Sequence, residues 1–411
     1  MTAKSRMLYQ SGKPAPGASA FVAITSTLLV SSPVWTPMIL AWAGYRAVRS
    51  SIDSGCTSSG QRIKSEHLCE HDHDEENLAD EDEGRLLQNR HEEPQKEPQS
   101  REARDERPRE NLRHLQRREQ CLRWGILVLL LWLSYMPVRR WARFLKSSWW
   151  EKFWFNQVGI KVIGPQDWPP ADPRCGGQHK YKQLLYAIVP HGIFPFGLGF
   201  AALSKLHEDV FNLGGVVVAS AVQWVPLLRH VIGWIGGVEA TPNGVSDALV
   251  AGTSLAVAPG GIGEMFWGFP RPGCKPDEEY ALLHGRKGFV RMALKHRVPL
   301  VPVYVFGNTK LFKRVQLPQW VESLSRAVRT SFVLFWGRWG LPVPFSVPLQ
   351  YAIGAPLDEH VRSHRQQRGL RQDITEAQID ALHNKFCDAL VRLFDEHKAE
   401  YGWAHKTLRI V

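Results

Sequence analysis

Paired cysteines and glycosylation sites are both missing from this 411-residue chain. It has no C-x-x-C pair, its six cysteines are widely separated, and no Asn-x-Ser/Thr sequon occurs. Small secreted domains depend on closely patterned cysteines, so this spacing argues against a disulfide framework and indicates reduced thiols facing a cytosol. The missing sequon is compatible with a cytosolic body.

Charge is absent from residues 14–45. The core of this run, residues 20–45, exceeds the roughly 20 residues that a helix needs to cross a bilayer, although Pro33 and Pro37 would kink it. A cleaved signal peptide remains an alternative, as does an organelle transit peptide, because the first acidic residue is Asp53. We favour an N-terminal hydrophobic membrane anchor over residues 1–49.

Large apolar residues are scarce between residues 50 and 119, where acidic stretches and alternating Arg and Glu dominate. Such a segment cannot bury enough surface to fold alone, so a disordered charged insert is predicted, apart from a solvated helix near its end. Four ligand-type residues lie inside it: His67, Cys69, His71 and His73. A solvated tail explains them better than a metal site, and we assign no metal.

A second apolar run, residues 124–138, opens a predicted membrane or interfacial region at residues 120–158. It barely reaches across the hydrocarbon unless Arg123 and Arg139 snorkel, so a re-entrant or interfacial helix is the alternative. Residues 139–155 mix cations with aromatics, which is typical of a helix lying in the headgroup layer. A net charge of +11, a pI near 9.4 and sixteen tryptophans favour a membrane interface over a nucleic acid.

Residues 159–411 alternate buried strand patterns with glycine or proline breaks and helical patterns. Strands are expected over residues 184–189, 216–221, 253–258 and 300–306, and helices between them. This alternation predicts an α/β fold with a mostly parallel sheet flanked by helices, in which ligands bind beyond the carboxyl ends of the strands. His191, Glu264 and Asn308 each directly follow a predicted strand, so we expect the three to meet at one edge.

The last predicted helix begins at a capping box formed by Thr375 and Gln378. Apolar residues then recur at three- and four-residue steps from Ile379 to Phe394. This stripe predicts core packing rather than a functional surface.

Several motifs together resemble the type 2 diacylglycerol acyltransferase family, from about Trp124 to the C-terminus. They are Val189-Pro-His-Gly192, Pro259-Gly-Gly-Ile-Gly-Glu264, the runs 285–294 and 298–307, Phe335-Trp-Gly-Arg-Trp-Gly-Leu-Pro-Val-Pro344 and Ala352-Ile-Gly-Ala-Pro-Leu357. The resemblance implies a glycerolipid-acyltransferase-like sheet with N-terminal membrane-embedded helices. Two positions depart from the pattern: Val189 replaces the first histidine of His-Pro-His-Gly, and Phe196 replaces an aspartate of the wider superfamily. Glu264 is therefore the expected partner of His191.

The resemblance implies transfer of a fatty acyl group from acyl-CoA, as co-substrate without a further cofactor, to the free hydroxyl of diacylglycerol. His191 would act as general base and Glu264 would orient it. An oxyanion would be stabilised by the N–H of Gly192 or of Gly260 and Gly261. The remaining expected substrate-binding residues are Pro190 and Asn308 at the edge, Phe194 and Phe196 along an acyl path or in the core, and Arg286, Lys287 and Gly288 for CoA phosphates.

Alternatives remain open at this point. The acceptor could be a monoacylglycerol, a long-chain alcohol or a sterol, and Gly244-Val-Ser-Asp-Ala248 half-resembles the nucleophile elbow of a serine lipid hydrolase without its final glycine. The expected location is the endoplasmic reticulum membrane, with the catalytic domain facing the cytosol, or the lipid droplet surface. Expected partners are membrane lipid and no nucleic acid, and a homo-oligomer is left open.

Overall fold

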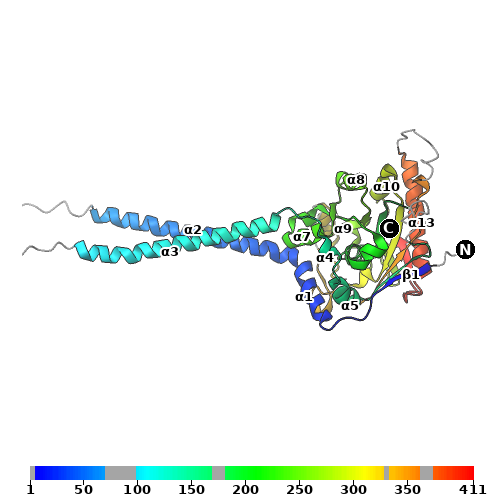
Figure 1. Ribbon diagram of the computed structural model, residues 1–411, viewed down its shortest axis with the longest axis horizontal. Helices are drawn as coiled ribbons and strands as arrows, with labels where there is room; N and C mark the ends of the chain where they lie inside the picture. The colour runs from blue at the N-terminus through cyan, green and yellow to red at the C-terminus, as the bar shows by residue number, and fades with distance from the viewer. Residues whose placement is uncertain (1–4, 70–98, 169–180, 328–332, 362–373) are drawn as a thin grey trace, which may run out of the picture. The chain divides into compact units, whose positions relative to one another are not determined.

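The protein, described here by a computed structural model, is placed over residues 5–69, 99–168, 181–327, 333–361 and 374–411. It divides into two compact units, residues 1–34 with 137–411 and residues 35–136, and each is described by itself. The first unit contains the α/β body predicted from the sequence (Figure 1).

Eight strands form the main sheet of this unit, in the order β1-β2-β11-β8-β3-β6-β4-β5. Their bounds are β1 Ser5–Gln10, β2 Ile160–Pro165, β3 Leu185–Val189, β4 Gly215–Val218, β5 Gly237–Glu239, β6 Leu255–Val257, β8 Leu300–Phe306 and β11 Leu349–Ile353. The five strands from β8 to β5 run parallel, whereas β1 pairs antiparallel with β2 and β11 antiparallel with β8. The predicted mostly parallel sheet is confirmed, and its mixed edge was not predicted.

The two faces of the sheet bury different residues of the same strand. In β3, Tyr186 and Ile188 join one core cluster, while Leu185, Ala187 and Val189 join the other. This alternation follows from the two-residue period of a strand, and burial on both faces explains its unbroken apolar run.

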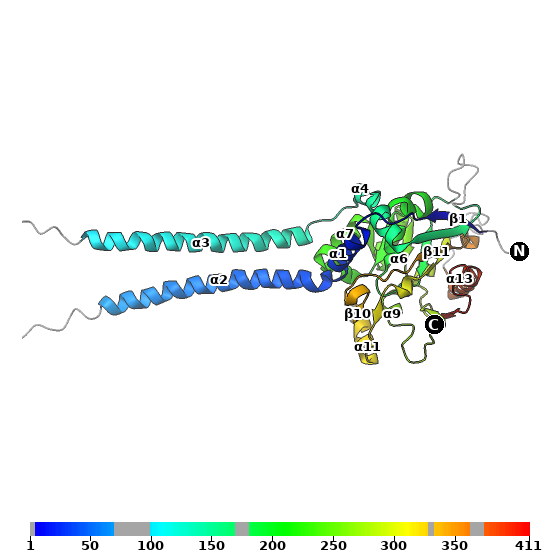
Figure 2. The ribbon, with the colours of Figure 1, turned by 90° about the horizontal axis from the view of Figure 1, so that it is seen from below.

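Different sets of helices cover the two faces of the sheet (Figures 1 and 2). The first group comprises α1 Ala18–Val30, η1 Trp150–Phe155, α5 Asn156–Val158, α6 Phe196–Ala201 and η3 Leu206–Phe211; the second comprises α8 Pro242–Val250, α10 Gly288–His296 and α13 Glu376–His397. The remaining short helices are α4 Ala142–Leu145, η4 Ser220–Trp224, α7 Pro226–Trp234, α9 Gly261–Glu264, η5 Asn308–Lys310, α11 Gln319–Ala327 and η6 Arg338–Gly340. The predicted capping box of Thr375 and Gln378 starts α13, and its apolar stripe is buried, as predicted.

Two small sheets extend the body. Strand β12, Thr407–Ile410, pairs parallel with β7, Glu278–Ala281, and β10, Phe335–Trp336, pairs antiparallel with β9, Lys313–Arg314. The β7–β12 pair leads into the loop at residues 282–287, and the β9–β10 pair presents a turn at the surface. Neither pair was predicted, because both join segments that are distant in sequence.

The second unit contains most of α2, Ser32–Cys69, and α3, Gln99–Tyr135, which lie side by side. Ser51 Oγ accepts hydrogen bonds from Gln120 Nε2 at 2.8 Å and from Trp124 Nε1 at 3.1 Å. Residues 50–69 belong to helix α2 and not to the disordered insert predicted there, whereas residues 99–119 belong to α3, where the sequence predicts a solvated helix near the end of the insert. Residues 70–98 lie outside the described part of the chain, as do the side chains of the group His67, Cys69, His71 and His73.

The membrane predictions have a mixed outcome. Among the described residues, no single helix is both long and apolar enough to cross a bilayer, while α1 and α2 as far as Arg49 pass that test together as a bent pair. Residues 139–155, predicted to form one interfacial helix, contain the two short helices α4 and η1, and Trp141 and Trp149 are exposed. Trp154 and Phe155 are buried in the core because they pack on Phe200 of α6.

Candidate active site

The carboxyl ends of three adjacent strands meet at one edge of the sheet. Because β3 lies between β8 and β6 and all three run parallel, the residues that follow them are neighbours. His191 follows β3, Glu264 ends α9 after β6, and Asn308 begins η5 after β8. The structure brings these three residues together, as the strand pattern predicts.

Asn308 fastens the turn that carries His191. Its Nδ2 donates to the carbonyl oxygens of Pro190 at 2.7 Å and His191 at 3.0 Å, and its Oδ1 accepts the N–H of Gly197 at 3.2 Å. An amide is the side chain that supplies two donors and an acceptor here. Gly192 has a φ of 71°, and a Cβ there would lie 2.9 Å from the carbonyl oxygen of Asn308, so the turn requires glycine.

A buried ion-pair network holds the η5 turn in place next to Asn308. Glu279, 3% exposed, accepts a hydrogen bond from Thr309 Oγ1 at 2.8 Å and pairs with Lys310 at 2.9 Å. Lys406, just before β12, pairs with the same carboxylate. The β7–β12 pair and the edge of the main sheet are thereby joined through one side chain.

Glu264 holds the same turn from the other side. It is 5% exposed, and its Oε2 accepts the main-chain N–H of His191 at 2.6 Å while its Oε1 accepts the N–H of Leu282 at 3.1 Å. A Cβ on Gly260 would lie 2.5 Å from the Glu264 carboxyl carbon, so this turn also requires glycine. Burial raises the pKa of Glu264 to about 7, against the two N–H groups and Arg286, which lower it.

The carboxylate of Glu264 therefore positions the main chain of His191 rather than its imidazole, which corrects the predicted ring-orienting contact. The ring nitrogen Nδ1 lies 2.8 Å from the carbonyl oxygen of Gly192. A carbonyl only accepts, so Nδ1 carries the proton and Nε2 keeps its lone pair. Within the described residues Nε2 has no hydrogen-bond partner, and burial lowers the pKa of His191, which keeps the ring neutral.

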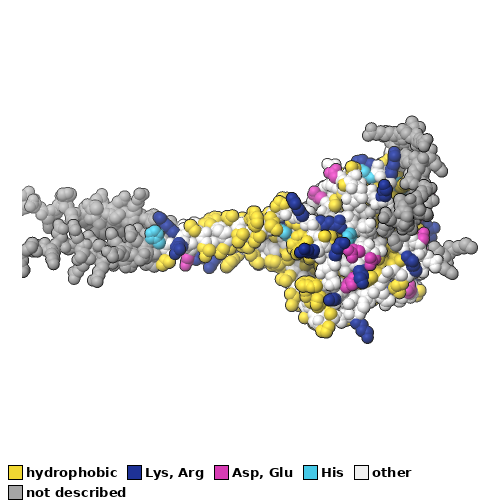
Figure 3. All heavy atoms as spheres, viewed as in Figure 1, with side chains coloured by type: hydrophobic (Ala, Val, Ile, Leu, Met, Phe, Trp, Pro, Cys, Tyr) yellow, Lys and Arg dark blue, Asp and Glu magenta, His cyan; other side chains and the backbone are white. Residues whose placement is uncertain are grey.

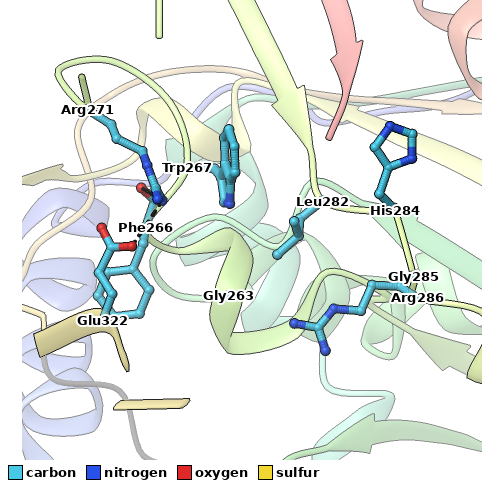
Figure 4. A pocket seen from close by; sticks show the side chains of 9 residues that line it. All are labelled: Gly263, Phe266, Trp267, Arg271, Leu282, His284, Gly285, Arg286 and Glu322. Atoms are coloured by element: carbon cyan, nitrogen blue, oxygen red, sulfur yellow. Dashed lines mark hydrogen bonds and ion pairs between the residues drawn. The ribbon is translucent and has the colours of Figure 1, made fainter. Parts of the chain in front are cut away.

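A cavity of about 370 Å³ opens at Gly263, the residue before Glu264, and we call it the cavity beside Glu264 (Figure 4). It is lined by Gly263, Phe266, Trp267, Arg271, Leu282, His284, Gly285, Arg286 and Glu322. The Arg286 guanidinium extends toward Gly263, where a Cβ would lie 3.1 Å from its Nη2. Arg271 pairs with Glu322 at 3.1 Å and lies 4.4 Å from the centroid of the Trp267 ring.

Sequence reasoning missed Arg271, Trp267 and Glu322. They lie in the 265–277 loop and on α11, and no strand end or glycine motif marks them. The signal that was present is the Gly268–Gly273 turn, whose two glycines have φ values of 100° and 83° and turn Arg271 back toward the cavity.

Other predicted residues have different surroundings from those expected. Lys287 Nζ pairs with Asp380 on α13 at 2.5 Å and does not line the cavity, while Gly288 begins α10. Phe196, 5% exposed, packs on Trp154, Phe200 and Phe312 in the core, so the half-buried Phe194 is the more accessible of the two. The Gly261 N–H is bonded to the Ala258 carbonyl at 3.1 Å and is not available to an oxyanion.

The chain is similar in sequence to known acyltransferases. Residues 177–411 match a family model described as diacylglycerol acyltransferase. Human diacylglycerol O-acyltransferase 2-like protein 6 is 26% identical over 311 residues, covering 68% of this chain and 84% of its own length, and human acyl-CoA wax alcohol acyltransferase 2 is 26% identical with the same two shares. The structure of the 1-acyl-sn-glycerophosphate acyltransferase PlsC from Thermotoga maritima aligns with a TM-score of 0.31 at 16% identity, covering 53% of this chain and 67% of that one.

Protonation of Glu264 predicts a pH dependence of stability. Because its pKa is raised from an ordinary 4.5 to about 7, the folded state holds a proton that the unfolded state has released, so stability falls as pH rises between those values. Glu264→Gln should remove this decline, on the order of 3 kcal/mol, measured as the free energy of unfolding at pH 4.5 and 7. The exposed Glu359→Gln is the control, and an unchanged slope in Glu264→Gln would contradict the assignment.

Replacing Asn308 by the isosteric aspartate removes the two N–H donors that hold the His191 turn, so we expect this change to lower catalytic turnover. Asn308→Asp places a carboxylate against the carbonyls of Pro190 and His191, which displaces the turn, and roughly a 10²-fold loss of turnover is expected. The loss is measured by comparing the turnover of the variant and the wild type in membranes, each normalised to the amount of folded protein. The exposed Asn243→Asp serves as the matched control, and wild-type turnover in Asn308→Asp would show that the clamp is dispensable.

Proposed function

The chain belongs to the diacylglycerol acyltransferase family, and from that membership we propose that it transfers a fatty acyl group from acyl-CoA to the free hydroxyl of diacylglycerol. The products are triacylglycerol and CoA. The observation that carries the mechanism is the open Nε2 of His191, on a turn held by Glu264 and Asn308.

His191 has the properties of a general base for an alcohol. Its neutral Nε2 takes the proton of the acceptor hydroxyl while the hydroxyl oxygen attacks the thioester carbonyl. When the tetrahedral intermediate collapses, the C–S bond breaks and the same proton passes to the leaving thiolate. Such proton transfer contributes roughly 10² to 10⁴ in rate, and no acyl-enzyme is required.

The oxyanion formed in this reaction needs N–H donors close to His191. With the Gly261 N–H already bonded, the main-chain N–H groups of Gly192 and Gly260 are the donors that we assign. Both glycines lie in turns packed against Asn308 and Glu264, so the donors are held in place before substrate arrives.

The cavity beside Glu264 is the proposed site for the phosphates of acyl-CoA. Arg286 and Arg271 bring two guanidinium groups to it, and Glu322, which pairs with Arg271, is the acidic residue among those that line it. Guanidinium groups bind phosphates in a bidentate manner, and the indole of Trp267 offers a flat apolar face for the nucleotide. Lys287 has no part in this assignment because Asp380 engages it.

The names of the relatives do not select one acceptor, since one is named for diacylglycerol and another for a wax alcohol. We therefore take diacylglycerol from the description of the family model. Monoacylglycerol, long-chain alcohols and sterols are the competing acceptors. Assays in which each is offered at equal concentration decide among them.

We propose that the enzyme lies at the endoplasmic reticulum membrane, with its catalytic unit facing the cytosol, and the lipid droplet surface is the alternative. The uncharged stretch of α1 and early α2 supports a membrane anchor. Among the described side chains, Cys121, Cys274 and Cys387 are free thiols, which fits a reducing compartment.

A serine hydrolase is the rival reading, and the structure supplies one observation in its favour. Ser246 Oγ lies 3.0 Å from His296 Nε2. However, Ser246 lies inside α8 rather than on a strand-to-helix turn, and within the described residues no carboxylate bonds the His296 ring.

An acyl-CoA assay with diacylglycerol in membranes tests the proposal. His191→Ala should lose at least roughly 10²-fold of triacylglycerol synthesis without losing membrane attachment, because the base is removed and the fold is kept. Triacylglycerol synthesis should also fall in Glu264→Ala, because the His191 N–H loses the carboxylate that accepts its hydrogen bond. Ser246→Ala and His296→Ala are the matched controls and should stay within about twofold of wild type.

Near wild-type transfer in His191→Ala would overturn the mechanism. Transfer to an alcohol or sterol but not to diacylglycerol would overturn the acceptor alone. Labelling of Ser246 by a fluorophosphonate, with loss of activity, would favour the hydrolase.

A further inference from the structure

A group of large apolar side chains is exposed on one part of the catalytic unit, far in sequence from the predicted membrane helices. Its members come from α11, the β9–β10 pair and the following turn, and we call it the Trp320–Trp339 surface: Val315, Trp320, Leu324, Leu334, Trp336, Trp339 and Leu341. Trp320 is 67% exposed and Trp339 is 64% exposed. Val315 and Leu334 are joined by a main-chain hydrogen bond of 2.8 Å, and β9 pairs with β10, so these segments are neighbours, and several large apolar side chains exposed on neighbouring segments indicate an interaction site.

The local structure holds these side chains outward. In the turn after β10, the Gly337 N–H bonds the Leu341 carbonyl at 2.7 Å and the Arg338 N–H bonds the Val343 carbonyl at 2.8 Å. A Cβ on Gly337 would lie 1.7 Å from the Val343 oxygen, so this closed turn requires glycine. Trp339 adopts a φ of 57°, a strained conformation for a bulky residue that is kept because the turn imposes it.

The charge around this surface has one sign. Between Leu311 and Ile353 the sequence contains five Arg or Lys residues and a single acidic residue, Glu322. Glu322 is 3% exposed and paired with Arg271, so it presents no negative charge outward. Arg338 lies over the Trp339 ring at 4.5 Å, and Lys313 is exposed beside Trp336. Aromatic rings mixed with unopposed cations are typical of proteins that enter the headgroup layer of anionic membranes.

The surface is continuous with the apolar helix α1. Ser26 of α1 donates to the Pro342 carbonyl at 2.7 Å, so the turn after β10 contacts this uncharged helix (Figure 2). Ile24 and Leu28 of α1 are 61% and 51% exposed, and hydrophobic side chains gather over α1 in Figure 3. A bilayer that accommodates α1 is therefore adjacent to the tryptophans of the turn.

We propose that the Trp320–Trp339 surface is a second membrane contact. It binds the interfacial layer of an anionic phospholipid bilayer and holds the catalytic unit there. The three tryptophans enter the headgroup level and Lys313 and Arg338 bind lipid phosphates. Resting on the proposed function, this contact holds the catalytic unit at the bilayer that contains the acceptor, and the Arg271–Glu322 ion pair connects α11 to the cavity assigned to acyl-CoA.

The test uses the full chain reconstituted in phosphatidylcholine vesicles, with or without phosphatidylserine, containing a phospholipid that carries a diazirine in its acyl chain. After illumination, labelled residues are mapped by mass spectrometry. Residues 313–327 and 333–343 should be labelled as well as α1, while Val250 on α8, 75% exposed but isolated, should not. The double variant Trp336→Asp with Trp339→Asp should reduce labelling of its own segment at least fivefold and leave α1 labelled; Val250→Asp should change neither.

Two further measurements test the role of the cations and the link to acyl transfer. Lys313→Glu with Arg338→Glu should lower labelling in vesicles with phosphatidylserine and have little effect without it. The tryptophan double variant should raise the KM for bilayer diacylglycerol and leave kcat for a dispersed short-chain acceptor within about twofold of wild type. An unlabelled segment in the wild type, or crosslinks to a second copy of the chain instead of lipid, would overturn the proposal. Labelling without any acyl transfer would instead count against the proposed function alone.

Discussion

The candidate active site depends on the buried carboxylate of Glu264, which binds the main chain of His191 and not its ring. Taking the Glu264 carboxyl group out of water is costly, and the N–H groups of His191 and Leu282 together with Arg286 offset that cost. On the other side of the same turn, the Asn308 amide binds the carbonyls of Pro190 and His191. A histidine at a strand end is thereby fixed from both neighbouring strands.

This arrangement leaves the imidazole free for chemistry. In a charge-relay geometry the acid binds the ring, whereas here the Gly192 carbonyl sets the ring tautomer and the acid sets the backbone. The absence of an aspartate at the position of Phe196 is explained by the same geometry, since Phe196 is needed in the aromatic core with Trp154 and Phe200. The position of His191 and the tautomer of its ring are therefore controlled by different groups.

The sequence predicts correctly those features that depend on local interactions or on a periodic pattern of apolar residues. Strand β8 has the predicted extent and β3 begins one residue later than predicted, because burial on both faces leaves an uninterrupted apolar run. The edge where His191, Glu264 and Asn308 meet follows from parallel strands ending together. Sequence reasoning failed where contacts between distant segments decide. Nothing near Lys287 indicates that Asp380 would engage it, nothing near Trp154 indicates core burial, and the motif at Glu264 cannot reveal which atoms of His191 its carboxylate binds. Within the charged insert the helix near its end was predicted, but the helical conformation of residues 50–69 was not, because it continues from the apolar start of α2.

The central claim is that His191 presents an unprotonated, substrate-facing Nε2, and chemical modification of that atom tests it most directly. The full-length enzyme in membranes would be treated with diethyl pyrocarbonate at pH 7 and the modified histidines mapped by mass spectrometry, with and without a non-hydrolysable acyl-CoA ether. The account predicts that His191 is modified readily and protected by the acyl-CoA ether, while the buried His230 reacts slowly in both samples. A His191 ring that resists modification, or one that is modified equally in the presence of the ether, would contradict the account.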